Sequence, residues 1–208
     1  MAEKKERLKG PQRKEQIIQA AISIMTERGL SGTTTRLIAE KVGISEPALY
    51  RYFPRKKDIL LEALDEIGDR PLTILSEVGG EDEPVPQRIL KLAGAYYEFV
   101  TANAGESMLF FEVLTGSRDP EIREALGRKF VSRTNLVAGM FEAGKRQGSV
   151  REDLDTKVAA WQILSLGITL VFAFVMGLEG ILTKDKALLA VEELMENIVS
   201  NASAADTP

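Results

Sequence analysis

Residues 36–53 read RLIAEKVGISEPALYRYF, and they contain the clearest structural pattern in the sequence. Apolar residues recur along it at the spacing of a helix, and Gly43 interrupts the pattern near its middle. Ser45, just after the glycine, is a typical helix N-cap. The stretch therefore predicts two short helices, over about 35–42 and 45–52, joined by a tight turn.

The spacing within this pair of helices is that of a helix-turn-helix. Ala39 is small where the two helices would cross, and Gly43 suits a turn that needs a positive φ. Leu49 and Phe53, four positions apart, point inward and leave the other side of the second helix free. An ordinary pair of core helices is the alternative, but it requires only the apolar positions. The combination favours a helix-turn-helix whose second helix enters the major groove of DNA.

The rest of the chain has helical periodicity and no sustained alternation of apolar and polar residues, which predicts an all-α protein. A helix precedes the helix-turn-helix and others follow it; they are expected over 12–28, 55–78, 86–103, 106–116, 119–147, 154–178 and 184–200. Pro71 predicts a kink or break in the second of these. We expect residues 1–57 to form a three-helix DNA-binding domain and residues 58–208 a larger helical domain, to which the family resemblance described below assigns effector binding and dimerisation.

Charge is distributed unevenly along the chain. The total is −4, but residues 1–60 hold 13 Lys and Arg against 7 Asp and Glu, a net of +6, which leaves −10 for residues 61–208. Chance clustering of solvated charges would give the same numbers. A basic end on an acidic body is nevertheless typical of a chain with one surface that faces nucleic acid.

The composition excludes several kinds of chemistry. The sequence has no Cys and no His, so disulfides, thiolate chemistry and the commonest metal ligand and general base are missing. It also has no glycine-rich phosphate loop and no nucleophile elbow. We expect no enzyme activity, no cofactor and no metal site.

Residues 161–178 form an uncharged run that is barely long enough to span a membrane. The run contains Gln, Ser and Thr and has no basic cluster at its ends, so we expect a buried helix and no membrane association. In so small a domain, one side of that helix is expected to pack on another subunit. The charged N-terminus does not resemble a secretion signal, which predicts a cytoplasmic protein.

The segment IIQAAISIMTERGLSGTTTRLIAEKVGISEPALYRYFPRKKDIL, residues 17–60, resembles the TetR family of regulators. The resemblance implies that Thr35 donates to a phosphate, that Ser45 to Ala48 lie nearest the base edges, and that Tyr52 and Lys56 contact the backbone. For Glu46 two roles stay open: accepting from a cytosine amino group, or stabilising the helix N-terminus, which we favour. The complete expected DNA-binding set is Thr35, Arg36, Ser45, Glu46, Pro47, Ala48, Tyr50, Arg51, Tyr52 and Lys56. The basic residues of the leader, Lys4, Lys5, Arg7, Lys9, Arg13 and Lys14, are expected to add phosphate contacts.

The resemblance also implies a homodimer that places two recognition helices in successive major grooves about 34 Å apart. We expect the last two long helices to form the interface, through Leu166, Leu170, Phe174, Leu188, Val191 and Met195. Aromatic and Met side chains suit an apolar effector pocket, and those expected to line it are Tyr96, Phe99, Met108, Phe110, Phe111, Phe130, Met140 and Trp161. Plain core packing is the alternative for each of them.

The predicted function is a ligand-responsive transcription regulator, expected to be a repressor, that binds double-stranded DNA at a palindromic operator and is released by a hydrophobic or amphipathic small molecule. One alternative is an architectural or adaptor protein with a helix-turn-helix and no ligand. A small helical enzyme is a remote alternative.

Overall fold

The computed structural model describes residues 10–77, 83–116 and 118–199, and within these ranges the chain is helical, with one isolated pair of bridged residues, Val150 and Val199. Its helices are α1 (Gly10–Gly32), α2 (Thr35–Val42), α3 (Glu46–Leu49), α4 (Lys56–Glu77), α5 (Val85–Ala102), α6 (Ala104–Gly116), α7 (Pro120–Arg146), α8 (Thr156–Val175) and α9 (Lys184–Glu196). The all-α prediction is confirmed. Four of the expected phosphate-contacting residues of the leader, Lys4, Lys5, Arg7 and Lys9, lie outside the described residues.

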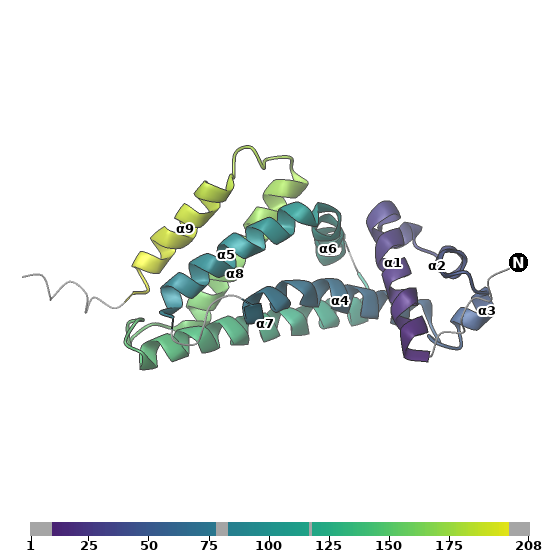
Figure 1. Cartoon of the computed structure of the whole chain (residues 1–208), viewed down its shortest axis with the longest axis horizontal. Coiled ribbons are helices and arrows are strands. Elements are labelled where there is room, and N and C mark those ends of the chain that lie inside the picture. The colour runs from purple at the N-terminus through teal and green to yellow at the C-terminus, as the bar shows by residue number, and fades with distance from the viewer. Residues whose placement is uncertain (1–9, 78–82, 117, 200–208) are drawn as a thin grey trace, which may run out of the picture.

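The molecule is elongated, with a small unit of α1, α2 and α3 at one end and the remaining helices in a larger body (Figure 1). Helix α4 leaves the small unit and runs beside α7 into the body. Helices α5, α8 and α9 form the rest of the body, in which α8 packs on α7 and α5 packs on α4. Helix α6 packs on α1 where the small unit meets the body. The position of α4 makes it the covalent and mechanical link between the two ends.

Two glycines shape the small unit. Gly29 has a φ of 70° and interrupts α1 just before its last residues, and Gly43 has a φ of 74° and ends α2. This left-handed region strains residues with a Cβ, so both positions favour glycine. The amide of Gly43 donates to the carbonyl oxygens of Ala39 and Glu40, which closes α2 and turns the chain toward α3.

Two sequence-based boundaries were wrong. Helix α4 continues through Pro71 to Glu77, so the predicted break is absent. A proline removes only one hydrogen bond of the helix ladder, and contacts along a long helix can compensate for that loss. Helix α3 ends at Leu49 as a single turn of α-helix, and the chain through Tyr52 continues as turns that a simple periodicity does not distinguish from helix.

The core of the small unit extends into the body. Ile17, Ile38, Leu49 and Phe53 are buried together with Ile59 of α4. The same cluster includes residues of α6 and α7, namely Leu109, Val113, Ile122 and Leu126. The two ends of the molecule therefore share one apolar cluster. The domain boundary after residue 57 stays a prediction, and this cluster crosses it.

Helix α8 is less buried than expected. It is long and apolar enough to cross a membrane by length and composition, and 28% of its apolar window is buried inside the chain. Its inner side packs through Ala159, Ala160 and Leu170, while a row of large apolar side chains on the other side is exposed. That row consists of Val158, Trp161, Ile168, Phe172 and Met176. The helix is thus buried on one side only, and the other side is open in the single chain.

Candidate nucleic-acid interface and its link to the helical body

Side-chain caps fix the two helices of the helix-turn-helix. Thr34 is the N-cap of α2, and its hydroxyl accepts from the amide of Leu37 at 3.2 Å. Ser45 is the N-cap of α3 and accepts from the amide of Ala48 at 3.3 Å. Each cap satisfies an amide that the first turn of a helix leaves without a partner. The caps and the αL turn at Gly43 together define the angle between α2 and α3.

The helix-turn-helix leaves one side of α3 free for contacts. Leu49 is fully buried beneath it, whereas Ser45, Pro47 and Tyr50 are exposed and Ala48 is partly exposed. Of the remaining predicted residues, Arg36 and Arg51 are exposed and Tyr52 and Lys56 are partly buried. Most of the predicted DNA-binding residues thus lie at the surface of the small unit, and their role in DNA binding stays a prediction.

Thr35 and Glu46 have a contact that the sequence did not predict. Thr35 is buried, and its hydroxyl donates to the Glu46 carboxylate across the two helix N-termini. The carboxylate therefore lies at the first turns of both α2 and α3, where a negative charge is stabilised by the helix dipoles. This geometry agrees with the helix-terminus role for Glu46. It also means that the Thr35 hydroxyl, expected to donate to a phosphate, already has an acceptor in this conformation.

The three basic residues at the start of α4 have different environments. Arg55 and Lys57 are paired with carboxylates, as described next. Lys56 makes no ion pair or hydrogen bond with any residue that the structure describes. Its ammonium is the one of the three that remains available for an external anion.

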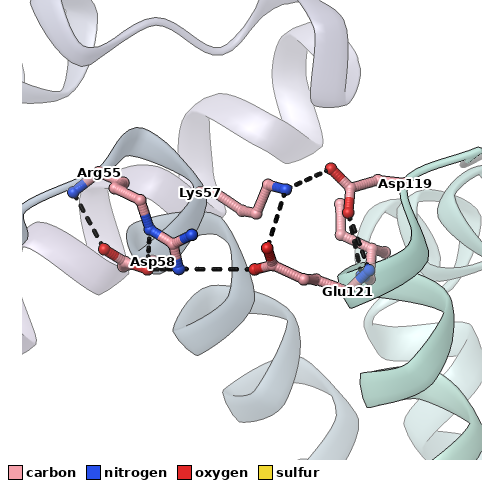
Figure 2. A network of polar contacts seen from close by, with 6 residues as sticks. Arg55, Lys57, Asp58, Asp119 and Glu121 are labelled. Carbon is pink, nitrogen blue, oxygen red and sulfur yellow. Dashed lines mark hydrogen bonds and ion pairs between the residues drawn. The ribbon is translucent and has the colours of Figure 1, made fainter.

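A charged network joins the start of α4 to the start of α7 (Figure 2). Lys57 lies 2.7 Å from Asp119 and 3.4 Å from Glu121, measured between its Nζ and the carboxylate oxygens. Arg55 binds Asp58 at 2.6 Å and reaches Glu121 at 3.5 Å. The network connects the helix that follows the small unit to a helix of the body.

Hydrogen bonding sets the protonation of this network. The hydrogen bond from Lys57 lowers the pKa of Asp119, and the one from Arg55 lowers the pKa of Asp58. The hydrogen bond to Asp119 in turn raises the pKa of Lys57. All of these groups are charged near neutral pH. Asp119 is also the N-cap of α7 and accepts from the amides of Glu121 and Ile122.

A second set of interhelical contacts lies closer to the core. Arg70 of α4 pairs with Glu106 of α6 and, at 3.2 Å, with Glu66. Gln19 of α1 donates to Glu66, so the contact reaches three helices. Since α1 is part of the small unit, these contacts form a second connection between that unit and the body. Sequence periodicity did not predict either set, because charged residues far apart in the chain have no register that brings them together.

The predicted effector-pocket residues divide among three neighbouring apolar clusters. Tyr96, Phe99 and Phe111 pack around Val100 and Leu170, whereas Phe110 packs against the cluster of the small unit. Met140 belongs to a third cluster, and Phe130 contacts the ring of Trp161 with centroids 6.4 Å apart. Met108 and Trp161 are 49% and 62% exposed. The pocket stays a prediction, and these two residues lie at the surface of the single chain.

The predicted interface residues divide between the inside and the surface. Leu170, Val191 and Met195 are buried within the chain, so they face its own core rather than a partner. Leu166, Phe174 and Leu188 are partly buried. The interface stays a prediction, because helical periodicity identifies two apolar sides of α8 but does not say which of them faces inward.

The chain is similar to known regulatory proteins, most clearly over its N-terminal part. Residues 17–63 match the family described as bacterial regulatory proteins of the tetR family. The fatty acid metabolism regulator protein of Bacillus subtilis is 22% identical over 148 residues, which cover 71% of this chain and 76% of the relative. The nucleoid occlusion factor SlmA of Marinobacter nauticus is 28% identical over 168 residues, covering 80% of this chain and 82% of the relative.

Solved structures share the fold over nearly the whole chain. A TetR transcription regulator from Haloarcula marismortui superposes with a TM-score of 0.79 at 19% identity, covering 91% of this chain and all of that one. A transcriptional regulator from Saccharomonospora viridis, solved in complex with choline, has a TM-score of 0.73 at 24% identity, covering 92% of this chain and all of that one.

The two functions of Asp119 can be separated by substitution. Asp119→Ser keeps a side-chain cap for α7 and loses the charge, whereas Asp119→Ala loses both. We expect the melting temperature to be highest for the wild type, lower for Asp119→Ser and lowest for Asp119→Ala. Because the pKa of Asp119 is lowered in the folded protein, its charge stabilises the fold above the ordinary carboxyl pKa, and this contribution is lost as the pH falls through the lowered value. The difference between wild type and Asp119→Ser should therefore disappear in acid.

Thermal unfolding across pH and salt measures this difference. Molar salt should also reduce it, while the difference between the Ser and Ala variants should persist, because a neutral cap is not screened. Glu124→Ala, which removes an exposed pair with Arg128 on the same helix, is the control and should change the melting temperature little. Equal melting temperatures for the Ser and Ala variants would refute the capping role.

Proposed function

The chain belongs to the TetR family of bacterial regulatory proteins, and from that premise we propose that it binds a palindromic operator as a dimer, represses transcription there and is released by a small molecule. The family relatives are transcription factors and not enzymes, and the absence of Cys and His from the sequence agrees with this. A regulator of this kind works where the chromosome lies, so the proposed location is the cytoplasm.

The exposed side of α3 is the observation that supports DNA binding most directly. Its first turn presents Ser45, Pro47 and Ala48 outward, short residues that allow the helix to approach base edges closely. Lys56 has no partner within the described part of the chain, and Arg36 and Arg51 are exposed. Such residues supply phosphate contacts that position the helix without selecting a sequence.

Selection of genomic fragments by the purified protein at moderate salt tests this function. We expect enrichment of a two-fold symmetric site whose halves are one helical turn apart, about 34 Å between centres. Candidate metabolites are then tested for release of the protein from the selected site. Enrichment that follows no symmetric sequence would count against the proposal.

Tyr52→Phe gives a sharper test of the backbone contact. If the Tyr52 hydroxyl donates to a phosphate, its loss should weaken binding by about tenfold or more, because hydrogen bonds to charged groups contribute about 1.5–3 kcal/mol. The loss should be similar for the operator and for unrelated DNA. Fluorescence anisotropy with both DNAs measures it. Tyr97→Phe removes the same hydroxyl from α5, in the body, and should leave both affinities unchanged.

The open side of α8 supports dimerisation. Trp161, Ile168 and Phe172 are 62%, 41% and 45% exposed and lie along one side of the helix. Exposed apolar residues in such a row are costly in water unless a partner covers them. Gln162, Ser165 and Thr169 lie beside them and are also exposed, and these polar groups suit a protein interface better than a lipid one. A second copy of α8, with α9 beside it, is the proposed cover.

Ile168→Glu tests the interface. A charge at this position should be buried without a partner in the dimer, so sedimentation should show monomers at concentrations where the wild type is dimeric. Operator affinity should fall strongly, since two half-sites are no longer bound together. Leu136→Glu on α7 replaces a residue that is 47% exposed and serves as the control, for which we expect a dimer. If the Ile168 variant also stays dimeric, the interface lies elsewhere.

A second function is a DNA-binding protein that acts without a ligand. It is favoured by the relative named a nucleoid occlusion factor, which matches over 80% of this chain. In that case the protein would still select DNA fragments, but no small molecule would change its affinity for them. The release assay above separates the two functions.

A further inference from the structure

Arg133 of α7 is an unusual residue for the interior of a helical body. Its Nη2 donates to the carbonyl oxygen of Gly68 on α4, and its guanidinium lies over the ring of Phe110 on α6, 5.6 Å from the ring centroid. Its Nε is enclosed and has no hydrogen-bond acceptor. A guanidinium has five N–H groups, and an enclosed one without acceptors is unfavourable.

No carboxylate among the described residues neutralises Arg133. Asp69 is close enough to act on it through space, but they form no ion pair. The Asp69 carboxylate instead accepts from Lys129, one turn earlier on α7, at 2.5 Å. Burial lowers the pKa of the Arg133 guanidinium, yet an arginine stays protonated near neutral pH. The body therefore contains a partly buried positive charge without its own counter-ion.

Tyr96 of α5 adds a second polar group without a partner. Burial raises its pKa, and its hydroxyl makes no hydrogen bond within the described ranges. Its ring packs so closely on α8 that a Cβ at Gly167 would lie 3.2 Å from the ring atom Cε1. Phe110, which lies under the guanidinium, and Phe111, which packs against the same apolar cluster as Tyr96, are consecutive residues of α6, so the two polar groups lie in adjoining parts of the body.

Five helices meet around these two residues. Gly68 comes from α4, Tyr96 from α5, Phe110 from α6, Arg133 from α7 and Gly167 from α8. Apart from the guanidinium and the phenol hydroxyl, these contacts are made by aromatic rings and glycines. A ligand bound here would meet one cation, one hydroxyl donor and apolar walls.

We propose that Arg133 and Tyr96 form the head-group site for an anionic, amphipathic effector, an apolar molecule with a single carboxylate. The carboxylate would accept from the guanidinium and from the Tyr96 hydroxyl, while its apolar part would lie among the aromatic side chains of α5, α6 and α8. This inference rests on the proposed ligand-responsive function and names the chemical class of the ligand. It narrows the hydrophobic or amphipathic small molecule that the sequence predicts to one with a negatively charged head group.

The site has a direct connection to α4. Arg133 now binds the Gly68 carbonyl oxygen, and Gly68 lies in the helix that leads to the DNA-binding unit. A carboxylate competes for the same guanidinium and forms a stronger, charge-assisted bond than a neutral carbonyl does. Ligand binding would therefore weaken a contact between α7 and α4, which gives the two states the different ligand affinities that switching requires.

Calorimetry on the DNA-free, full-length protein tests the ligand class. The probes are decanoate, 1-decanol and decyltrimethylammonium, which share a chain length and differ in head-group charge. We expect decanoate to bind at least about tenfold more tightly than decanol, as the loss of a charged hydrogen bond implies. The cationic probe should bind no better than decanol. Straight-chain acids from hexanoate to tetradecanoate cover other chain lengths.

Two variants identify the residues. Arg133→Met keeps much of the side-chain length, and decanoate should bind it no more tightly than decanol does. Its melting temperature should not fall, since the substitution removes an uncompensated charge. Tyr96→Phe should weaken decanoate binding several-fold with the fold retained. Arg133→Lys, which keeps the charge, should retain part of the preference and provides the comparison if the Met variant does not fold.

Several results would overturn the inference. They are equal affinity for decanoate and decanol, wild-type decanoate affinity in a folded Arg133→Met variant, or no binding of any acid in the series. Operator binding is measured separately and without ligand. A protein that prefers decanoate but binds no operator would refute the proposed function and leave the head-group site standing, whereas the reverse result would refute the site alone.

Discussion

The packing of α4 against α1 is the contact on which the rest of the structure depends. Phe53, Ile59 and Ala63 are buried in the cluster that also holds the helix-turn-helix together. Because these residues flank the start of α4, the core of the small unit fixes the direction in which α4 leaves it. The body is then built along that helix, with α7 beside it, while α6 packs separately against α1. The orientation of the recognition helix relative to the body is set at this single junction.

The polar contacts around that junction have a different character. The pairs of Lys57 with Asp119 and Arg55 with Asp58 lie at the surface, where ion pairs contribute little stability and are sensitive to salt. The Arg70 contacts are less exposed and connect α1, α4 and α6. Apolar burial thus holds the two ends together, while the ion pairs select one arrangement among those that the apolar contacts allow. Such a division suits a junction that has to change geometry without coming apart.

Local signals explain what could be predicted from the sequence. Gly43, Ser45 and the inward-facing Leu49 act within a few residues of one another, so their structure follows from spacing and capping alone. The same holds for the bounds of α2, which was predicted over 35–42 and is found over Thr35–Val42. Contacts between distant residues have no such signal. The hydrogen bond of Thr35 to Glu46 and the position of Arg133 over Phe110 depend on how whole helices pack, which periodicity does not specify.

The same limit applies to α8 and α9. Both sides of α8 are apolar, so the pattern showed that the helix is covered but not which side its own chain covers. The structure assigns Leu170 to the inside and Ile168 and Phe172 to the outside, a difference of only two positions along the chain. At Pro71 the expectation of a break was wrong, because the helix continues through this residue to Glu77 in spite of the hydrogen bond that a proline cannot donate.

The elongated shape has a consequence for how the protein meets DNA. The basic residues are concentrated in the first 60 positions, which hold a net charge of +6, and the small unit that they build lies at one tip of the long axis, while the remaining 148 residues carry −10. Separated charges of this kind give the molecule a large electric dipole along its axis. The field of a polyanion exerts a torque on this dipole, which turns the tip toward the double helix and the body away from it. Encounters are therefore oriented before any contact forms, so the arrangement acts on the association rate at low ionic strength, separately from the affinity of the final complex.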